Sequence, residues 1–187
     1  MCIRDRAYLG RLAGIETVSD AMAEPRLAGF IEMLMREDLA ASLTPPDGMD
    51  VGAYIDDVLG RFRNRSIRHL LSQIAWDGSQ KLPVRLFGAV ASALEAGRPV
   101  ARLAVPVAAW MRFVVTTAQA GEALTDPLAD RLLEIGRAAT GEADRDVAAF
   151  LGLDVFAQGP CRSAPFVQAL AVAYARLTAP DPLAALS

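Results

Sequence analysis

The residues on which metal and disulfide chemistry depend are scarce in this 187-residue chain. It has two cysteines, Cys2 and Cys161, and a single histidine, His69. Two cysteines are too few for the disulfide framework of a secreted protein of this size, and their spacing matches no metal-binding motif. Since zinc sites draw on several cysteines or histidines, we expect no metal site, and the reducing cytoplasm is the simplest location.

Strong charge of one sign and long apolar runs are also missing. The formal net charge is −3, so no overall electrostatic field favours nucleic acid or an anionic membrane. The most apolar run, residues 103–111, is about half the roughly 20 residues that a transmembrane helix needs. The N-terminus has no apolar segment of signal-peptide length. We therefore expect no nucleic-acid partner and no membrane partner.

Strand-like alternation of apolar and polar residues does not occur over any useful length, whereas apolar residues at helical spacing recur along the chain. Leu27, Phe30 and Ile31 begin one such series. Short loops rich in glycine and proline separate the series. The sequence predicts an all-α fold of about eight or nine helices in one domain, with a central buried helix at residues 101–118 and a frayed end at residues 180–187.

Residues that favour helix starts mark the expected helix boundaries. They are Thr17, Pro25, Asp50, Asn64, Asp126 and Ser163. Asn64 predicts a helix over residues 65–76, which Gly78 would end in a left-handed turn. Residues 79–81 would then form a short connection to a new helix that opens at Pro83.

The segment of residues 61–83 concentrates the unusual side chains of the chain. It contains His69, Trp76 and the only lysine, Lys81. On a helix, His69 and Gln73 would share one face, and Gln73 and Lys81 could line one cleft. The helix dipole disfavours a lysine at a helix start. A substrate oxygen or carboxylate would therefore explain Lys81, with a plain surface lysine as the alternative.

Several residues of this segment could have a purely structural or surface role instead of a role in binding or catalysis. His69 lies among arginines and is expected near the surface, and Trp76 is expected in the core. The arginines at positions 61, 63, 65 and 68 could bind a phosphate, but such a run is more often a solvated helix face. The chain has no glycine-rich phosphate loop, and one histidine cannot be assigned to a Ser–His–Asp set.

A family resemblance is carried by the run Asp-Gly-Ser-Gln-Lys-Leu-Pro at residues 77–83, preceded by Asn64, His69 and Gln73. This pattern is similar to the C-terminal domain of the mannitol dehydrogenase family, the polyol-specific long-chain dehydrogenases. Similar runs at residues 7–10, 108–112 and 126–128 extend the resemblance over nearly all of residues 7–187. Arg65 departs from the family, which usually has a proline there.

The resemblance implies a two-domain oxidoreductase that uses no metal. Its N-terminal Rossmann domain binds NAD or NADP, and its all-α C-terminal domain supplies a Lys-x4-Asn-x2-His motif whose lysine is the general base. When residues 7–10 are aligned, the family's histidine falls at Ile3, and its asparagine and lysine fall before Met1. We therefore expect no catalytic residue and no cofactor site in this chain, and a non-native start at residues 1–6.

Two substrate-binding residues are implied by the same resemblance. Lys81 matches a family lysine that contacts substrate, and Gln73 falls where several mannitol dehydrogenases have a substrate-contacting arginine. The implied function is the substrate domain of an enzyme that interconverts a polyol or sugar acid and its ketone, such as mannitol and fructose or mannonate and fructuronate. Its partners would be that small molecule and the Rossmann domain. The alternative is a free-standing all-α binding or interaction module without catalysis.

Overall fold

The computed structural model describes residues 4–66, 68–157 and 159–186. All regular elements in these ranges are helical, and extended backbone pairs only at one isolated antiparallel bridge between Thr17 and Leu70. The predicted all-α fold is confirmed. None of the helices in these ranges is long and apolar enough to cross a membrane.

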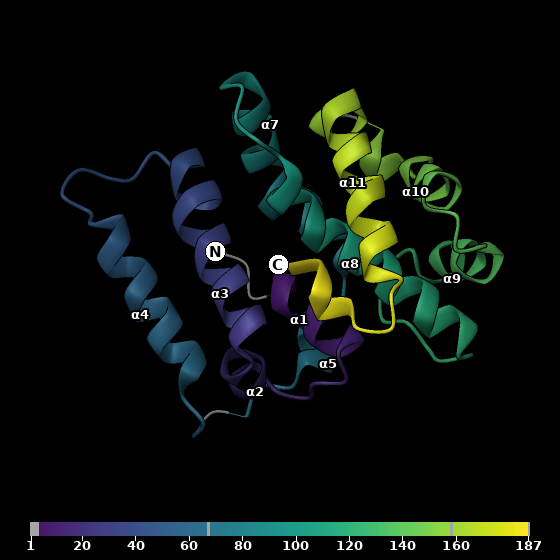
Figure 1. The fold of residues 1–187 in the computed structure, drawn as a ribbon, viewed down its shortest axis with the longest axis horizontal. Coiled ribbons are helices and arrows are strands. Elements are labelled where there is room, and N and C mark those ends of the chain that lie inside the picture. Colours follow the sequence, from purple (N-terminus) through teal and green to yellow (C-terminus); the bar gives the residue numbers. More distant parts are fainter. Residues whose placement is uncertain (1–3, 67, 158, 187) are drawn as a thin grey trace.

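Eleven α-helices are found in the described ranges (Figure 1). They are α1 (Arg4–Leu12), α2 (Val18–Ala23), α3 (Pro25–Met33), α4 (Val51–Arg63), α5 (Leu71–Ile74), α6 (Gly78–Leu82), α7 (Gly88–Glu95), α8 (Ala101–Gln119), α9 (Ala129–Ala138), α10 (Ala143–Leu151) and α11 (Ala164–Leu177). Turns of π-helix extend α3 over Leu34–Leu39 and join α6 to α7 over Pro83–Phe87. Turns of 3₁₀-helix lie at Ala40–Ser42, Asp154–Phe156, Pro160–Arg162 and Pro182–Leu186.

The first helix starts earlier than its sequence pattern indicates. The apolar spacing is helical from Ala7, but α1 already begins at Arg4, within the segment that we expected to be a non-native start. Ile3, where the family's histidine position falls, lies outside the described residues.

Helix α8 is the centre of the molecule, as its apolar sequence predicts. Helices α1, α9 and α11 pack against it (Figure 1), and most of its side chains are buried even around Pro106 in its interior. The ring of Trp110 lies 5.6 Å from that of Phe150 and 5.8 Å from that of Phe156. Helices α3 and α4 lie on one side of this core and α9 and α10 on the other.

The helix predicted over residues 65–76 is wrong. Asn64 directly follows the last residue of α4, and its side chain accepts a hydrogen bond from the Ser66 amide (2.9 Å). The chain then pairs with the segment before α2, where the Leu71 amide donates to the Glu16 carbonyl (2.9 Å). Because this pairing satisfies backbone groups outside a helix, α5 begins only at Leu71.

The left-handed residue between α5 and α6 is Asp77, with φ 57°, and not Gly78 as predicted. Gly78 is the first residue of α6. A Cβ atom there would lie 2.3 Å from Trp110 Nε1 and 2.5 Å from Tyr8 Oη, so the close approach of α6 to α1 and α8 requires glycine. Residues 79–81, predicted to form a connection, belong to α6. Pro83 is the first residue of the π-helical turn that leads into α7, as predicted, but this turn continues directly from α6.

The C-terminal tail is packed where the sequence predicted fraying. Leu183 and Ala185 in the last 3₁₀ turn are buried, and the turn contacts α3 and α11. Asp181 pairs with Arg26 (2.6 Å) and accepts the Leu183 amide (3.0 Å), which ties the turn to the start of α3. The apolar side chains of the tail therefore belong to the core.

Most of the predicted helix starts are confirmed. Thr17 caps α2 and Asp50 caps α4 through their side-chain oxygens, and Pro25 is the first residue of α3. Ser163 occupies the N-cap position of α11 without a side-chain hydrogen bond there. Asp126 lies three residues before α9, whose N-cap is the intervening leucine, and its carboxylate instead binds the start of α6.

Candidate functional site

Lys81 lies on α6 at an open pocket of about 570 Å³. The lining comes from α6, from the π-helical turn that follows it and from the 3₁₀ turn after α10. The lining residues are Ser79, Gln80, Lys81, Pro83, Val84, Arg85 and Val155. Two of these side chains are cationic and none is a carboxylate, so the pocket suits a ligand rich in oxygen atoms.

Asp77 is the ion-pair partner of Lys81. The Lys81 Nζ atom donates to Asp77 Oδ2 at 2.5 Å, and about a third of each side chain is exposed (33% and 35%). An ammonium group has three donors, so two remain for substrate oxygens.

The helix that carries Lys81 begins at Gly78 and continues through the π-helical turn into α7, so Lys81 lies in the first turn of this helical run. The helix dipole disfavours a cation there, as the sequence suggested. The nearby Asp77 carboxylate compensates the charge of Lys81. Lys81 is a candidate for binding substrate because it lines the pocket and two of its ammonium N–H donors are not used by Asp77.

Arg85 is a second cation on the same pocket, and the sequence reasoning missed it. It follows Lys81 by four residues along the continuous helical run from α6 into α7. Its guanidinium makes no hydrogen bond or ion pair with the described residues. Because Asp77 already compensates Lys81, the charge of Arg85 is left without a carboxylate partner among the described residues. The four-residue spacing of Lys81 and Arg85 in the sequence could have predicted that both side chains lie on one helix face.

Asp126, in the loop before α9, holds the first turn of α6. Its Oδ2 atom accepts the Ser79 amide (2.9 Å), and its Oδ1 atom accepts the Ser79 hydroxyl (2.5 Å) and the Leu128 amide (2.9 Å). The Asp77 amide donates to the carbonyl of Thr125 (2.9 Å). The loop therefore binds the chain on both sides of the first residue of α6, which no local sequence pattern reveals.

The model of the mannitol dehydrogenase C-terminal domain family matches residues 6–178. The chain belongs to this family. The resemblance predicted from residues 61–83 and their flanks is confirmed.

Relatives of this chain include proteins named as oxidoreductases. D-mannonate oxidoreductase of Escherichia coli K12 is 40% identical over 174 residues, which cover 91% of this chain and 35% of that protein. Mannitol 2-dehydrogenase of Phaeosphaeria nodorum is 32% identical over 127 residues, which cover 67% of this chain and 22% of that protein. The chain thus spans about a third of the length of this D-mannonate oxidoreductase.

Two solved structures share the fold of this chain. Mannitol 2-dehydrogenase of Pseudomonas fluorescens, in a ternary complex with NAD and D-mannitol, matches 98% of this chain and 37% of its own, with a TM-score of 0.86 and 23% identity. A D-sorbitol dehydrogenase in substrate-free form matches with a TM-score of 0.83 and 24% identity. At these identities the likeness establishes the arrangement of helices.

The other residues singled out in the sequence do not line the Lys81 pocket. His69 is exposed in the extended segment before α5, where its carbonyl accepts the Val18 amide (3.0 Å). Gln73 is exposed on α5, so the predicted common helix face of His69 and Gln73 is wrong. Gln73 is not among the residues that line the Lys81 pocket.

Trp76 is also not the core residue that we expected. It is 47% exposed and lines a small pocket of about 120 Å³ with Arg11 and Thr125. Among the four arginines of residues 61–68, Arg63 pairs with Glu32 (3.4 Å). The arginines at positions 61, 65 and 68 are exposed, as the interpretation of a solvated surface predicted. The described residues contain no group of three or more His, Cys, Asp or Glu side chains arranged to hold a metal ion.

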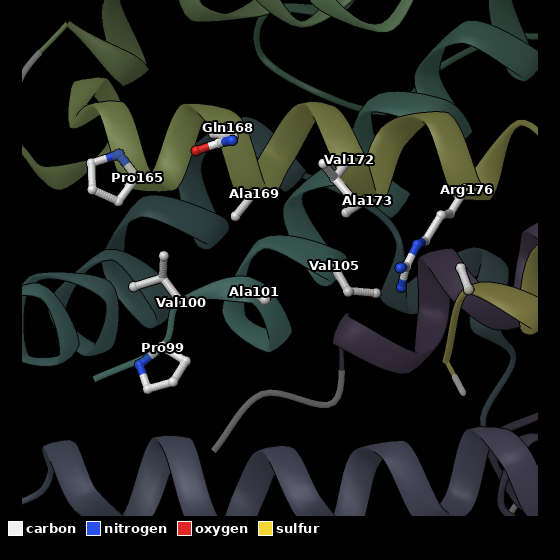
Figure 2. A pocket seen from close by; sticks show the side chains of 11 residues that line it. Pro99, Val100, Ala101, Val105, Pro165, Gln168, Ala169, Val172, Ala173 and Arg176 are labelled. Carbon is white, nitrogen blue, oxygen red and sulfur yellow. The ribbon is translucent and has the colours of Figure 1, made fainter. Parts of the chain in front are cut away.

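A second cavity, of about 350 Å³, lies between α8 and α11 (Figure 2). Figure 2 shows Pro165, Ala169 and Val172 of α11 facing Val100 and Val105 across it. Its polar side chains are Gln168 and Arg176, and it contains none of the predicted site residues. The Lys81 pocket has two cationic side chains and includes a predicted site residue, and we take it as the candidate site.

Proposed function

We propose that this chain is the substrate-binding domain of an NAD- or NADP-dependent oxidoreductase. The reaction interconverts a secondary alcohol of a polyol or sugar acid and the corresponding ketone, such as mannitol and fructose or mannonate and fructuronate. The observation that carries the proposal is that the cationic side chains of Lys81 and Arg85 line one pocket. The 40% identity to a D-mannonate oxidoreductase supports it.

The role of Lys81 in this proposal is to hold the substrate. Two of its ammonium donors are available to hydroxyl or carboxylate oxygens, and Asp77 fixes the third. Because Arg85 adds a charge without a partner among the described residues, a sugar acid such as mannonate suits the pocket better than a neutral polyol. Gln73 is proposed as a contact for a part of the substrate that extends beyond this pocket.

The nucleotide cofactor does not fit the residues described. They form no strand–turn–helix unit of the kind that binds a dinucleotide, so we derive no step through it and propose an N-terminal Rossmann domain as its site. The reaction is proposed to need no metal. We also propose a cytoplasmic location, because two cysteines are too few for the disulfide framework of a secreted protein of this size.

Titration calorimetry on the 187-residue chain tests the proposal with D-mannonate and D-mannitol as probes. We expect both to bind, with D-mannonate the tighter, and no hydride transfer from NADH by the chain alone. Lys81→Met should weaken D-mannonate binding at least about tenfold, since it removes charged hydrogen bonds. Arg85→Met should weaken D-mannonate more than D-mannitol, and Gln73→Ala should weaken both.

Arg145→Met is the matched control, because Arg145 is an exposed arginine of α10 outside the pocket and its loss changes the net charge equally. It should bind as the unmodified chain does. If the folded chain binds neither sugar, the proposal fails and the free-standing binding module is favoured. If Lys81→Met binds normally, Lys81 is a surface lysine.

A further inference from the structure

We propose that Asp126 is a positioning residue for Lys81: it fixes the first turn of α6 and thereby the ammonium group that meets the substrate. This inference rests on the proposed function, because it concerns the contact that Lys81 makes there. It adds a residue from a distant loop that does not line the pocket and that the sequence suggested only as a helix start.

The core side of the first turn of α6 has no room to move. Gly78 lies against Tyr8 and Trp110, which are 0% and 1% exposed, and even a single Cβ atom there would overlap both. The Tyr8 hydroxyl also donates to the carbonyl of Ala75 (3.2 Å), just before the turn. These contacts prevent the turn from moving inwards, toward α1 and α8.

The outer side of the same turn is held by the loop before α9. Asp126 binds both the amide and the hydroxyl of Ser79, which is itself 1% exposed. The Ser79 amide lies in the first turn of α6, where helical amides have no partner within the helix. Asp126 is therefore the group that satisfies this donor and keeps the turn against the core.

Asp77 connects this turn to the ammonium group. Its amide is bound by the Thr125 carbonyl (2.9 Å), its carbonyl accepts the Lys81 amide (3.0 Å), and its carboxylate binds the Lys81 ammonium (2.5 Å). Its left-handed φ of 57° is uncommon for a residue other than glycine, and such a conformation persists only where the surroundings impose it. Loss of the Asp126 hydrogen bonds to Ser79 would let the Asp77 backbone leave its left-handed conformation, and the Lys81 ammonium group would then lose its fixed position.

A purely structural cap would behave differently from a positioning residue. Loss of a cap lowers the melting temperature but leaves the folded site unchanged, whereas loss of a positioning residue alters Lys81 in protein that is still folded. Because Lys81 is the only lysine of the chain, lysine labelled with ¹³C and ¹⁵N gives one side-chain NMR resonance set that reports this ammonium group alone.

The test compares the Lys81 resonances of the unmodified chain, Asp126→Asn and Asp130→Asn, well below each melting temperature. Asp130 is an exposed acid in the first turn of α9, so its variant makes the same charge change without touching α6. We expect distinct shifts for the two Hε protons of Lys81 in the unmodified chain and in Asp130→Asn. In Asp126→Asn we expect these shifts to coincide, as in a freely rotating side chain.

Binding of D-mannonate, measured from the same resonances, gives the second readout. Asp126→Asn should bind about tenfold more weakly, as expected for losing hydrogen bonds to a charged group, and Ser79→Ala should lie between it and the unmodified chain. Ser79→Ala keeps the Asp126 carboxylate and removes one hydrogen bond, so it decides the question if Asp126→Asn does not fold.

The inference is overturned if Asp126→Asn folds and its Lys81 resonances are unchanged. If Asp126→Asn does not fold, unchanged Lys81 resonances in Ser79→Ala overturn it instead. Failure of the proposed function looks different: D-mannonate then leaves the Lys81 resonances of the unmodified chain unmoved, while the effect of Asp126→Asn on them is still seen.

Discussion

Single buried side chains tie distant parts of this domain together, and Asp146 of α10 does so at the carboxyl-terminal side of the core. It is 2% exposed and accepts hydrogen bonds from the Thr140 amide, the Gly141 amide and the Tyr174 hydroxyl, each at 2.9 Å. Burial raises the pKa of Asp146, but these hydrogen bonds outweigh it and hold the pKa below the ordinary value. One ionised carboxylate thus links α10, the loop before it and α11.

Replacement of Asp146 by asparagine should lower the free energy of unfolding by about 2 kcal/mol at neutral pH, because hydrogen bonds to a charged acceptor are lost. A depressed pKa means that the contribution is complete above the ordinary pKa of 3.8 and is lost as the pH falls through the folded-state value. Thermal unfolding at several pH values checks this: the two proteins should differ most above about pH 5 and converge in acid.

The exposed Asp144 on the same helix provides the control for this experiment. Asp144→Asn makes the same charge change in the first turn of α10 and should shift the melting temperature little. A constant difference between Asp146→Asn and the unmodified protein down to pH 2 would contradict the assignment of an ionised carboxylate.

At the scale of elements, the domain depends on how closely its helices approach α8. Gly136 of α9 is buried against α8, and a Cβ atom there would lie 2.6 Å from Ala118 Cβ and 3.0 Å from the carbonyl oxygen of Val114. A backbone carbonyl cannot move aside as a flexible side chain can. Glycine is therefore needed at this crossing for packing, as Gly78 is at the start of α6.

Gly136→Ala should destabilise the protein by about 2 kcal/mol, the usual cost of overpacking a core, although alanine favours a helix by about 1 kcal/mol over glycine. Gly60→Ala is the matched variant, because Gly60 is an exposed helical residue of α4 with nothing within 4 Å of an added Cβ. It should stabilise by about 0.5–1 kcal/mol. Denaturant unfolding of both proteins measures the two effects, and effects of equal sign would be inconsistent with the packing argument.

Helix ends show how far local sequence predicts structure. Thr17 and Asp50 cap the helices that their spacing predicts, since each side chain satisfies an amide within its own first turn. Asn64 has the same chemistry, but its oxygen binds the Ser66 amide in a turn. The segment after Asn64 is held by backbone pairing with residues before α2, a contact over fifty residues away that no local pattern reveals.

The whole molecule has one core, and its C-terminal tail is part of it. The apolar cluster that begins with Ala7 and Tyr8 in α1 includes Leu183 and Ala185 near the other end of the chain. Leu183 is 4% exposed in a turn that packs on α3 and α11. The position of residues 180–187 at the end of the chain suggested fraying, but two apolar side chains and the Asp181–Arg26 pair hold this segment in place.

Leu183→Ala should lower the free energy of unfolding by about 2–3 kcal/mol, since it leaves a cavity in the core. Leu43→Ala, at a leucine that is 49% exposed, should cost less than about 0.5 kcal/mol. Both are read from thermal or denaturant unfolding. A tail that frays in solution would give the two variants the same small effect.

The sequence by itself determined the helical class, the central buried helix, most of the helix starts and the family, because these depend on spacing and residue type along the chain. The tertiary structure decided what surrounds Lys81: Asp77 as its partner, Arg85 beside it, Gly78 against Tyr8 and Trp110, and Asp126 holding Ser79 from another loop. Those contacts join residues of α1, α6, α8 and the loop before α9, and only folding brings them within hydrogen-bonding and van der Waals distance.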